Sequence, residues 1–232
     1  VGDNSGWSVS NAGDVNGDGF DDVIVGADSD PFGISSSYVV FGKASGFSAT
    51  MELSSLDGSN GFRLRVAGDN LGRSVSNAGD VNGDGFDDVI VRTTRITQYS
   101  YVSGPSYVVF GKASGFSATM ELSSLDGSNG FRLDGEAAGD RLGDSISNAG
   151  DVNGDGFDDL IVGAPGADPN GELSGSSYII FGRSDFVSNV DFPGTAGDDE
   201  LTGTKAAERF EAGAGNDKMI GRGGADVFYG EA

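Results

Sequence analysis

The chain has 232 residues, with 41 glycines, 5 prolines and neither cysteine nor histidine. Its 14 lysines and arginines face 36 aspartates and glutamates, a formal net charge of −22 that repels nucleic acid and anionic membranes, so we expect neither as a partner. Ser–His and Cys–His catalysis is excluded, disulfides are absent, and no apolar run is long enough to span a membrane. We therefore expect a protein that is not an enzyme.

The chain opens inside a repeat. The first six residues, Val1-Gly2-Asp3-Asn4-Ser5-Gly6, align with Ala67-Gly68-Asp69-Asn70-Leu71-Gly72 further along the sequence. A first strand is predicted near Ser8–Ser10. The start within a repeat leads us to expect a piece of a longer protein.

An acidic nine-residue stretch follows this strand, and it occurs three times without change, at 14–22, 80–88 and 151–159. Oxygen-bearing side chains stand at positions 1, 3, 5 and 9, and position 7 can offer its carbonyl, which suits the six to eight oxygens that Ca²⁺ prefers. A glycine at position 6 permits the sharp turn. The alternative is a solvated Asp/Asn/Gly turn, but three identical copies favour calcium. The predicted ligands are Asp14, Asn16, Asp18, Phe20, Asp22, Asp80, Asn82, Asp84, Phe86, Asp88, Asp151, Asn153, Asp155, Phe157 and Asp159.

The loop is not an EF-hand, because an apolar β-branched run such as Val23–Val25 follows it where that motif requires a glutamate and a helix. Further strands are predicted at 38–41 and 62–64, which makes four strands in each full unit. Four antiparallel strands in a tandem unit suit a propeller blade. A Greek-key sandwich is the structural alternative, although it does not predict such faithful repeats.

Residues 1–183 resemble the FG-GAP repeat. The resemblance rests on 71–76, the loop 80–88, the strand 89–91 and an intact Gly163-Ala164-Pro165. It implies an all-β fold with four-stranded β-propeller blades, here three that form an incomplete ring, as in integrin α subunits and bacterial surface proteins. It also implies that the loop calcium is structural and braces each blade.

Two features depart from this pattern, and one further residue is unusual. Residues 92–99 replace the Gly-Ala-Pro segment of the second unit with a stretch that holds two arginines, which indicates either a specialised binding loop or drift or a frameshift in the gene. The third unit lacks a fourth strand after Phe181-Gly182. Trp7 is the single tryptophan, and it is either a surface residue or a platform for stacking a sugar.

After Phe192 a nine-residue period begins, with units starting at Gly194, Gly203, Ala212 and Gly221. This part resembles the RTX (hemolysin-type) calcium-binding nonapeptide repeat, which winds a parallel β-roll. The resemblance implies cations held between turns two repeats apart. The implied ligands are Asp199, Glu208, Asp217 and Asp226. We thus expect two domains, FG-GAP blades over 1–192 and a short parallel β-roll over 193–232.

Two function classes follow. The favoured one is a calcium-binding extracellular module of a secreted or surface bacterial protein, for cell adhesion or surface assembly, in which Ca²⁺ rigidifies the blade loops. The alternative is an accessory domain of a secreted hydrolase whose catalytic part lies elsewhere. The RTX resemblance implies type I secretion and an extracellular or cell-surface location. Beside calcium, the candidate partners are other copies of the chain, an extracellular protein or a glycan.

Overall fold

The computed structural model describes residues 4–27, 36–96, 101–137, 139–184, 186, 192–193, 198, 200–202, 209–211, 218–220 and 227–229. The chain divides into two compact units, Val1–Phe186 and Val187–Ala232. In the described residues the helices are two 3₁₀ turns, η1 (Leu53–Ser55) and η2 (Leu122–Ser124), and neither is long enough to cross a membrane. The expected all-β class is confirmed.

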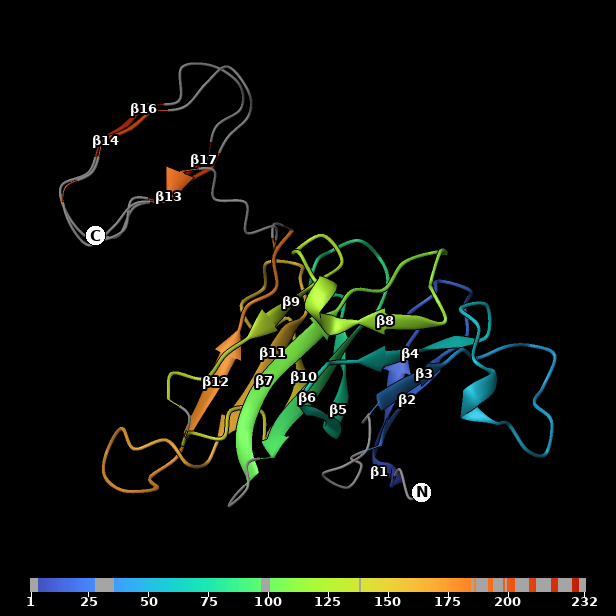
Figure 1. Ribbon diagram of the computed structural model, residues 1–232. Helices are drawn as coiled ribbons and strands as arrows, with labels where there is room; N and C mark the ends of the chain where they lie inside the picture. The colour runs from blue at the N-terminus through green and yellow to red at the C-terminus, as the bar shows by residue number, and fades with distance from the viewer. Residues whose placement is uncertain are drawn as a thin grey trace. The chain divides into compact units, whose positions relative to one another are not determined.

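The first unit contains three sheets, which lie side by side in chain order (Figure 1). Each begins as an antiparallel meander, because buried runs of valine and isoleucine alternate with glycine-rich turns. The first blade contains β1 (Ser5–Gly13), β2 (Asp22–Ala27), β3 (Ser36–Val40) and β4 (Gly61–Arg65). The second contains β5 (Asn70–Gly79), β6 (Asp88–Ile96), β7 (Tyr101–Val109) and β9 (Gly130–Leu133). The third contains β10 (Ser145–Gly150), β11 (Asp159–Ala164) and β12 (Ser176–Ile180).

The blades are therefore four-stranded in the first two repeats and three-stranded in the third, as the sequence predicts. The strands that the structure describes close no ring, so they form sectors of an incomplete propeller.

One short strand crosses from the second repeat to the first blade. β8 (Thr119–Glu121) lies in the connection between β7 and β9, yet it pairs in parallel with β4 of the first blade. Arg63 donates a side-chain hydrogen bond to Thr119 Oγ1 at 3.1 Å, and its backbone N–H donates to the Ala118 carbonyl at 3.0 Å. The second repeat thus covers the outer edge of the first blade.

The hydrophobic core lies between successive blades rather than within one. One cluster joins Ile24, Val39 and Phe62 of the first blade to residues of the second, among them Val75 and Val89. A second cluster joins the second blade to the third, with members such as Ile90, Val108, Ile146 and Leu160. Each sheet therefore presents apolar side chains on both faces, which explains why its central strands are continuous apolar runs.

A phenylalanine from each following repeat completes both cores. Phe116 stacks on Phe62 with ring centroids 4.6 Å apart and also contacts Phe41. Phe186 stacks on Phe131 at 4.2 Å and contacts Phe110 in the same arrangement. The two inter-blade junctions are thus built alike.

The second unit, described by itself, contains short parallel strands. β13 (Phe192–Pro193), β15 (Arg209–Glu211) and β17 (Val227–Tyr229) form one sheet, and β14 (Glu200–Thr202) and β16 (Lys218–Ile220) form another. The register pairs residues two nonapeptides apart, for example Leu201 with Met219 and Phe210 with Phe228. This alternation between two sheets is the pattern of a parallel β-roll.

Candidate calcium centres

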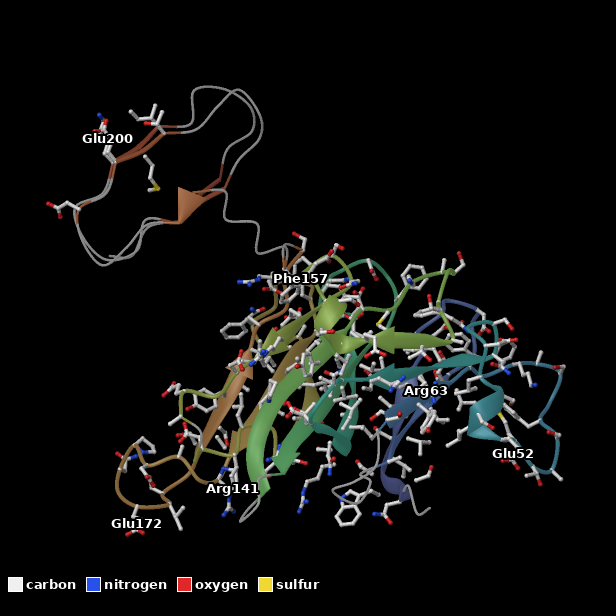
Figure 2. All side chains as sticks on the ribbon, in the orientation of Figure 1. Glu52, Arg63, Arg141, Phe157, Glu172 and Glu200 are labelled. Atoms are coloured by element: carbon white, nitrogen blue, oxygen red, sulfur yellow. The ribbon has the colours of Figure 1, made fainter. Side chains whose placement is uncertain are left out.

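Each acidic loop connects the first two strands of its blade. In the first blade β1 ends at Gly13 and β2 begins at Asp22, so the loop spans 14–21, and the other two loops span 80–87 and 151–158. Figure 2 shows Phe157 of the third loop at the end of the sheets opposite Arg141 and Glu172. All three loops are confined to this kind of hairpin turn, as the sequence predicts.

The carboxylate at position 1 organises the loop around itself. Asp14 Oδ1 accepts a hydrogen bond from the backbone N–H of Asp18 at 3.0 Å, and Oδ2 accepts one from Gly19 at 2.8 Å. Asp80 and Asp151 accept the equivalent bonds in their loops. These backbone hydrogen bonds, chiefly that from Gly156, lower the pKa of Asp151 below its usual range. The aspartate is thereby held in its charged form.

Positions 3 and 5 turn inward in the same way. Asn16 Oδ1 accepts from the backbone N–H of Asp18 at 2.9 Å, and Asp18 Oδ1 accepts from that of Phe20 at 3.0 Å. Gly19 has a φ of +88°, a conformation that glycine adopts without cost. The side-chain oxygens of positions 1, 3 and 5 are therefore gathered on one small, exposed loop.

Position 9 differs because it is buried. The Oδ2 of Asp22 accepts from the backbone N–H of Val15 at 3.0 Å, and its Oδ1 accepts from Gly42 at 2.7 Å. Asp88 makes the same pair of bonds to Val81 and Gly111, and Asp159 makes it to Val152 and Gly182. This aspartate ties the loop to the end of the third strand.

Burial raises the pKa of Asp22 to about 6 and that of Asp88 to about 8, and the charges at loop positions 5 and 1 add to the rise. Backbone hydrogen bonds oppose it in both cases. A buried carboxylate beside two others is an unfavourable cluster of negative charge, which a cation would relieve.

The residues present fit a calcium ion by donor type. Every predicted ligand offers oxygen, and an ionised carboxylate that accepts one N–H per oxygen keeps further lone pairs. In the described residues, however, no three carboxylates converge closely enough to form an ion site by themselves. The backbone N–H groups of the loop donate hydrogen bonds to these carboxylates. A bound ion therefore also needs the Asn amide oxygen and the Phe carbonyl as ligands.

Position 8, which the sequence does not assign to the ligand set, connects the blades. Asp87 Oδ2 accepts from the backbone N–H of Asp14 at 2.7 Å, although the two residues belong to different repeats. Asp158 Oδ2 accepts from the N–H of Asp80 at 3.0 Å in the next junction. Position 8 is aspartate in all three copies, although it is not among the predicted ligands. An invariant aspartate outside the ligand set is the sequence signal that could have revealed its contact with the neighbouring blade.

Glycines allow this close approach. A Cβ on Gly13 would lie 2.2 Å from Asp87 Oδ2, and one on Gly79 would lie 2.1 Å from Asp158 Oδ2. Lys112 and Arg183 add a backbone hydrogen bond each, to the carbonyls of Val15 and Val81 at 2.9 and 2.8 Å. The first and second acidic loops thus lie directly on the junction with the next blade.

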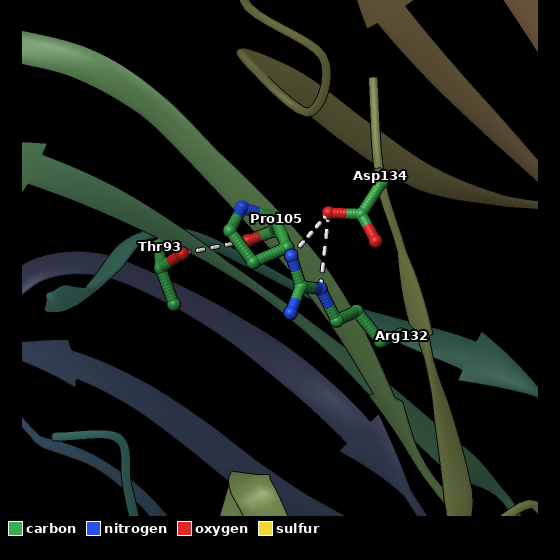
Figure 3. A network of polar contacts seen from close by, with 4 residues as sticks. All are labelled: Thr93, Pro105, Arg132 and Asp134. Carbon is green, nitrogen blue, oxygen red and sulfur yellow. Dashed lines mark hydrogen bonds and ion pairs between the residues drawn. The ribbon is translucent and has the colours of Figure 1, made fainter. Parts of the chain in front are cut away.

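The divergent segment of the second repeat continues a hairpin. Residues 92–96 extend β6, while 97–99 lie outside the described residues. Arg92 is buried and forms an ion pair with Asp144 of the third repeat, and Thr93 Oγ1 donates to the Pro105 carbonyl at 2.8 Å. Figure 3 shows the latter bond near the exposed pair of Arg132 and Asp134. The first of the two unexpected arginines therefore contributes to packing between blades.

Trp7 is exposed, and the guanidinium of Arg73 lies 5.5 Å from its ring centroid. Arg73 and Asp144 are its counterparts in the later repeats. Trp7 contacts Arg73 across the first junction, and Asp144 pairs with Arg92 across the second. A role for Trp7 in stacking a sugar stays a prediction.

In the second unit, the four implied ligands Asp199, Glu208, Asp217 and Asp226 lie outside the described residues. In the sequence each directly precedes one of the strands β14, β15, β16 and β17. Glu200 and Lys218 form an exposed ion pair at 2.5 Å across β14 and β16, and this hydrogen bond lowers the pKa of Glu200. The strand register thus supports the pairing of turns two repeats apart.

Comparison with known proteins agrees with the geometry. The model of the FG-GAP repeat matches residues 5–40, 71–109 and 142–180, and the model of the RTX calcium-binding nonapeptide repeat matches 202–232. These matches cover the first three strands of each blade and most of the second unit.

Integrin α chains are among the curated proteins that this chain resembles. Integrin alpha-PS5 of Drosophila melanogaster is 31% identical over 72% of this chain and 16% of its own length. Integrin alpha-4 of Xenopus laevis is 31% identical over 66% of this chain and 14% of its length, and integrin alpha pat-2 of Caenorhabditis elegans is 31% identical over 98% and 18%. The chain therefore spans less than a fifth of these relatives. It is built from three integrin-like FG-GAP repeats, followed by a tract of RTX calcium-binding nonapeptide repeats.

Proposed function

We propose that this chain is a rigid, calcium-dependent module for adhesion or surface assembly, and that Ca²⁺ fixes the angle between its blades. In each blade the ion is held by loop positions 1, 3, 5, 7 and 9, which in the first blade are Asp14, Asn16, Asp18, the Phe20 carbonyl and Asp22. The calcium-binding repeat types and the integrin α relatives support an adhesion-like module.

One observation carries this proposal: in the first and second loops, the residue that opens the loop also donates a hydrogen bond to the next blade and accepts one from it. The backbone N–H of Asp80 donates a hydrogen bond to the Asp158 carboxylate, while the side chain of Asp80 accepts hydrogen bonds from the backbone of its own loop. An ion that immobilises this side chain therefore immobilises the junction as well. Calcium supplies positive charge there, and the aspartates hold the loop shape.

The second unit has the same dependence in the proposal. Ca²⁺ binds between turns through Asp199 with Asp217 and through Glu208 with Asp226, and it winds the roll after the chain has left the cell. The RTX and FG-GAP repeats and the integrin α relatives support an extracellular or surface location. Within the proposal, the chain belongs to a bacterium and leaves the cell by type I secretion. The module itself performs no catalysis, which agrees with the absence of histidine and cysteine from the sequence.

Thermal unfolding in calcium and in chelator tests the proposal. Ca²⁺ that binds only the folded state stabilises by about 3 kcal/mol at a hundredfold excess over Kd. For a protein of this size we expect the midpoint to rise by roughly 2–4 °C for each kcal/mol. Magnesium at the same concentration is the control, since it demands stricter octahedral geometry. Equal midpoints in calcium and chelator would contradict the proposal.

A further inference from the structure

The two outermost sheet faces of the three-blade unit are apolar and exposed. We call the face that each blade turns toward the preceding repeat its leading face, and the opposite one its trailing face. In the second blade, the leading residues Val75, Val89 and Phe116 are at most 9% exposed, because the first blade covers them. Their counterparts in the first blade, Val9, Val23 and Phe47, are 65%, 48% and 56% exposed.

The third blade shows the complementary situation on its trailing face. Val152, Ile179 and Phe181 are 54%, 40% and 53% exposed. The equivalent residues of the second blade, Val81, Val108 and Phe110, are at most 5% exposed, because the third blade packs on them. One unit thus exposes the two halves of an interface that it forms twice internally.

The polar groups and the open glycines that this interface needs are also present on the two exposed faces. Asp21 is exposed, and it holds the same loop position as Asp87 and Asp158, whose carboxylates accept hydrogen bonds from the backbone of the preceding blade. On the third blade a Cβ on Gly150 or Gly154 would meet nothing within 4 Å. The equivalent Gly79 and Gly83 are closely approached by Asp158 and Phe157. The open glycines therefore leave room for an incoming Asp21 and Phe20.

We propose that a second copy of this chain docks head to tail, with its leading face on the trailing face of the first. The partner must present an FG-GAP leading face with its aspartate and phenylalanine in register, and this chain presents one itself. Such a contact is heterologous, so it propagates into longer assemblies. The proposal rests on the proposed function, since it names what the surface-assembly module assembles with.

Two features set the strength of the contact. The net charge of −22 repels a second copy, so association should strengthen when calcium occupies the loops and when salt screens the rest. The third sheet has three strands in the described residues. In the proposed contact, Phe47 of one copy would therefore meet Phe181 of the other without the fourth-strand ring that Phe62 or Phe131 provides inside the chain. The docking is therefore weaker than the internal junctions.

A complementation experiment tests the polarity. Val9→Asp places a charge on the leading face alone, and Ile179→Asp places one on the trailing face alone. Light scattering of the full chain in calcium should show the mass of the wild type rising with concentration and each variant remaining monomeric. An equimolar mixture of the two variants should form dimers, because one variant keeps an intact trailing face and the other an intact leading face. The dimers should grow no further, because both faces that remain exposed carry the substitution. Leu173→Asp, at a residue 64% exposed on a connection outside both faces, should assemble like the wild type.

A wild type that stays monomeric at every concentration, or a mixture that stays monomeric, would overturn the proposal. Each variant is first melted in calcium, and an unchanged midpoint shows that it is folded. A chain that calcium stabilises but that never associates would contradict the docking and leave the calcium function intact.

Discussion

The carboxylate of Asp158 in the third acidic loop accepts a hydrogen bond from the backbone N–H of Asp80 in the second loop at 3.0 Å, across 78 positions of sequence. The bond is returned by the N–H of Asp158 to the Asp80 carbonyl at 3.1 Å. This reciprocal pair occurs between Asp87 and Asp14 as well. It makes the acidic loops part of the inter-blade interface.

Asp158→Ala should therefore destabilise the blades by about 1.5–3 kcal/mol, the usual contribution of a hydrogen bond to a charged group. Asp21→Ala is the matched control, because Asp21 holds the same loop position in the blade whose leading face is exposed. At low protein concentration it should change stability by no more than about 0.5 kcal/mol. Urea unfolding in saturating calcium measures both. Equal losses would mean that position 8 acts within its own loop.

The identical segments 41–47 and 110–116 provide a second matched pair. Phe116 is buried in a stack with Phe62, so Phe116→Ala should cost about 3–5 kcal/mol. Phe47 occupies the same place in its segment but is exposed, and Phe47→Ala should leave the stability of the monomer nearly unchanged. Thermal unfolding of the two variants decides whether the phenylalanine stabilises through its neighbour or through its own loop.

Arg92 and Asp144 should be energetically coupled across the second junction. Asp144→Ala removes a carboxylate from a buried guanidinium and should cost about 2 kcal/mol, below the range for fully buried pairs because the Asp144 side chain is 33% exposed. Arg92→Met combined with Asp144→Ala should be less destabilising than the sum of the single changes. A double-mutant cycle by urea unfolding gives the coupling, which we expect at about 0.5–3 kcal/mol. Additive single effects would contradict it.

The two cation systems should respond separately to substitution. Asp84→Ala should sensitise the second blade to protease and leave the RTX tract protected in calcium. Asp217→Ala should do the reverse. Limited proteolysis followed by mass spectrometry locates the cleavage sites. Cleavage in both units after either change would show that the two units share one calcium-dependent folding step.

Much of the blade could be predicted from local patterns. The runs at 23–25 and 38–41 are short and apolar, and they predict the centre of β2 and the second half of β3. The acidic loop also lies where its Asp/Asn/Gly pattern places it. These features depend on neighbouring residues alone, so one sequence contains enough information to find them.

The contacts between blades could not be predicted in this way. Thr50-Met51-Glu52 and Thr119-Met120-Glu121 are the same three residues with the same flanking sequence. Only the second triplet forms a strand. It does so because the edge of β4 is available to it, and no blade precedes the first triplet in the described chain. The double role of Asp22, whose two oxygens both accept backbone N–H groups, depends likewise on Gly42, which lies far along the sequence.

The pairing of β8 with β4 also imposes an order on folding. Arg63 and Thr119 stand 56 positions apart, so the edge of the first blade stays open until most of the second repeat has been synthesised. Closing so long a loop costs entropy before the new strand contributes stability. An N-terminal fragment that stops before β8 should consequently expose its β4 edge, and the maturation of the first blade should lag one repeat behind the growing chain.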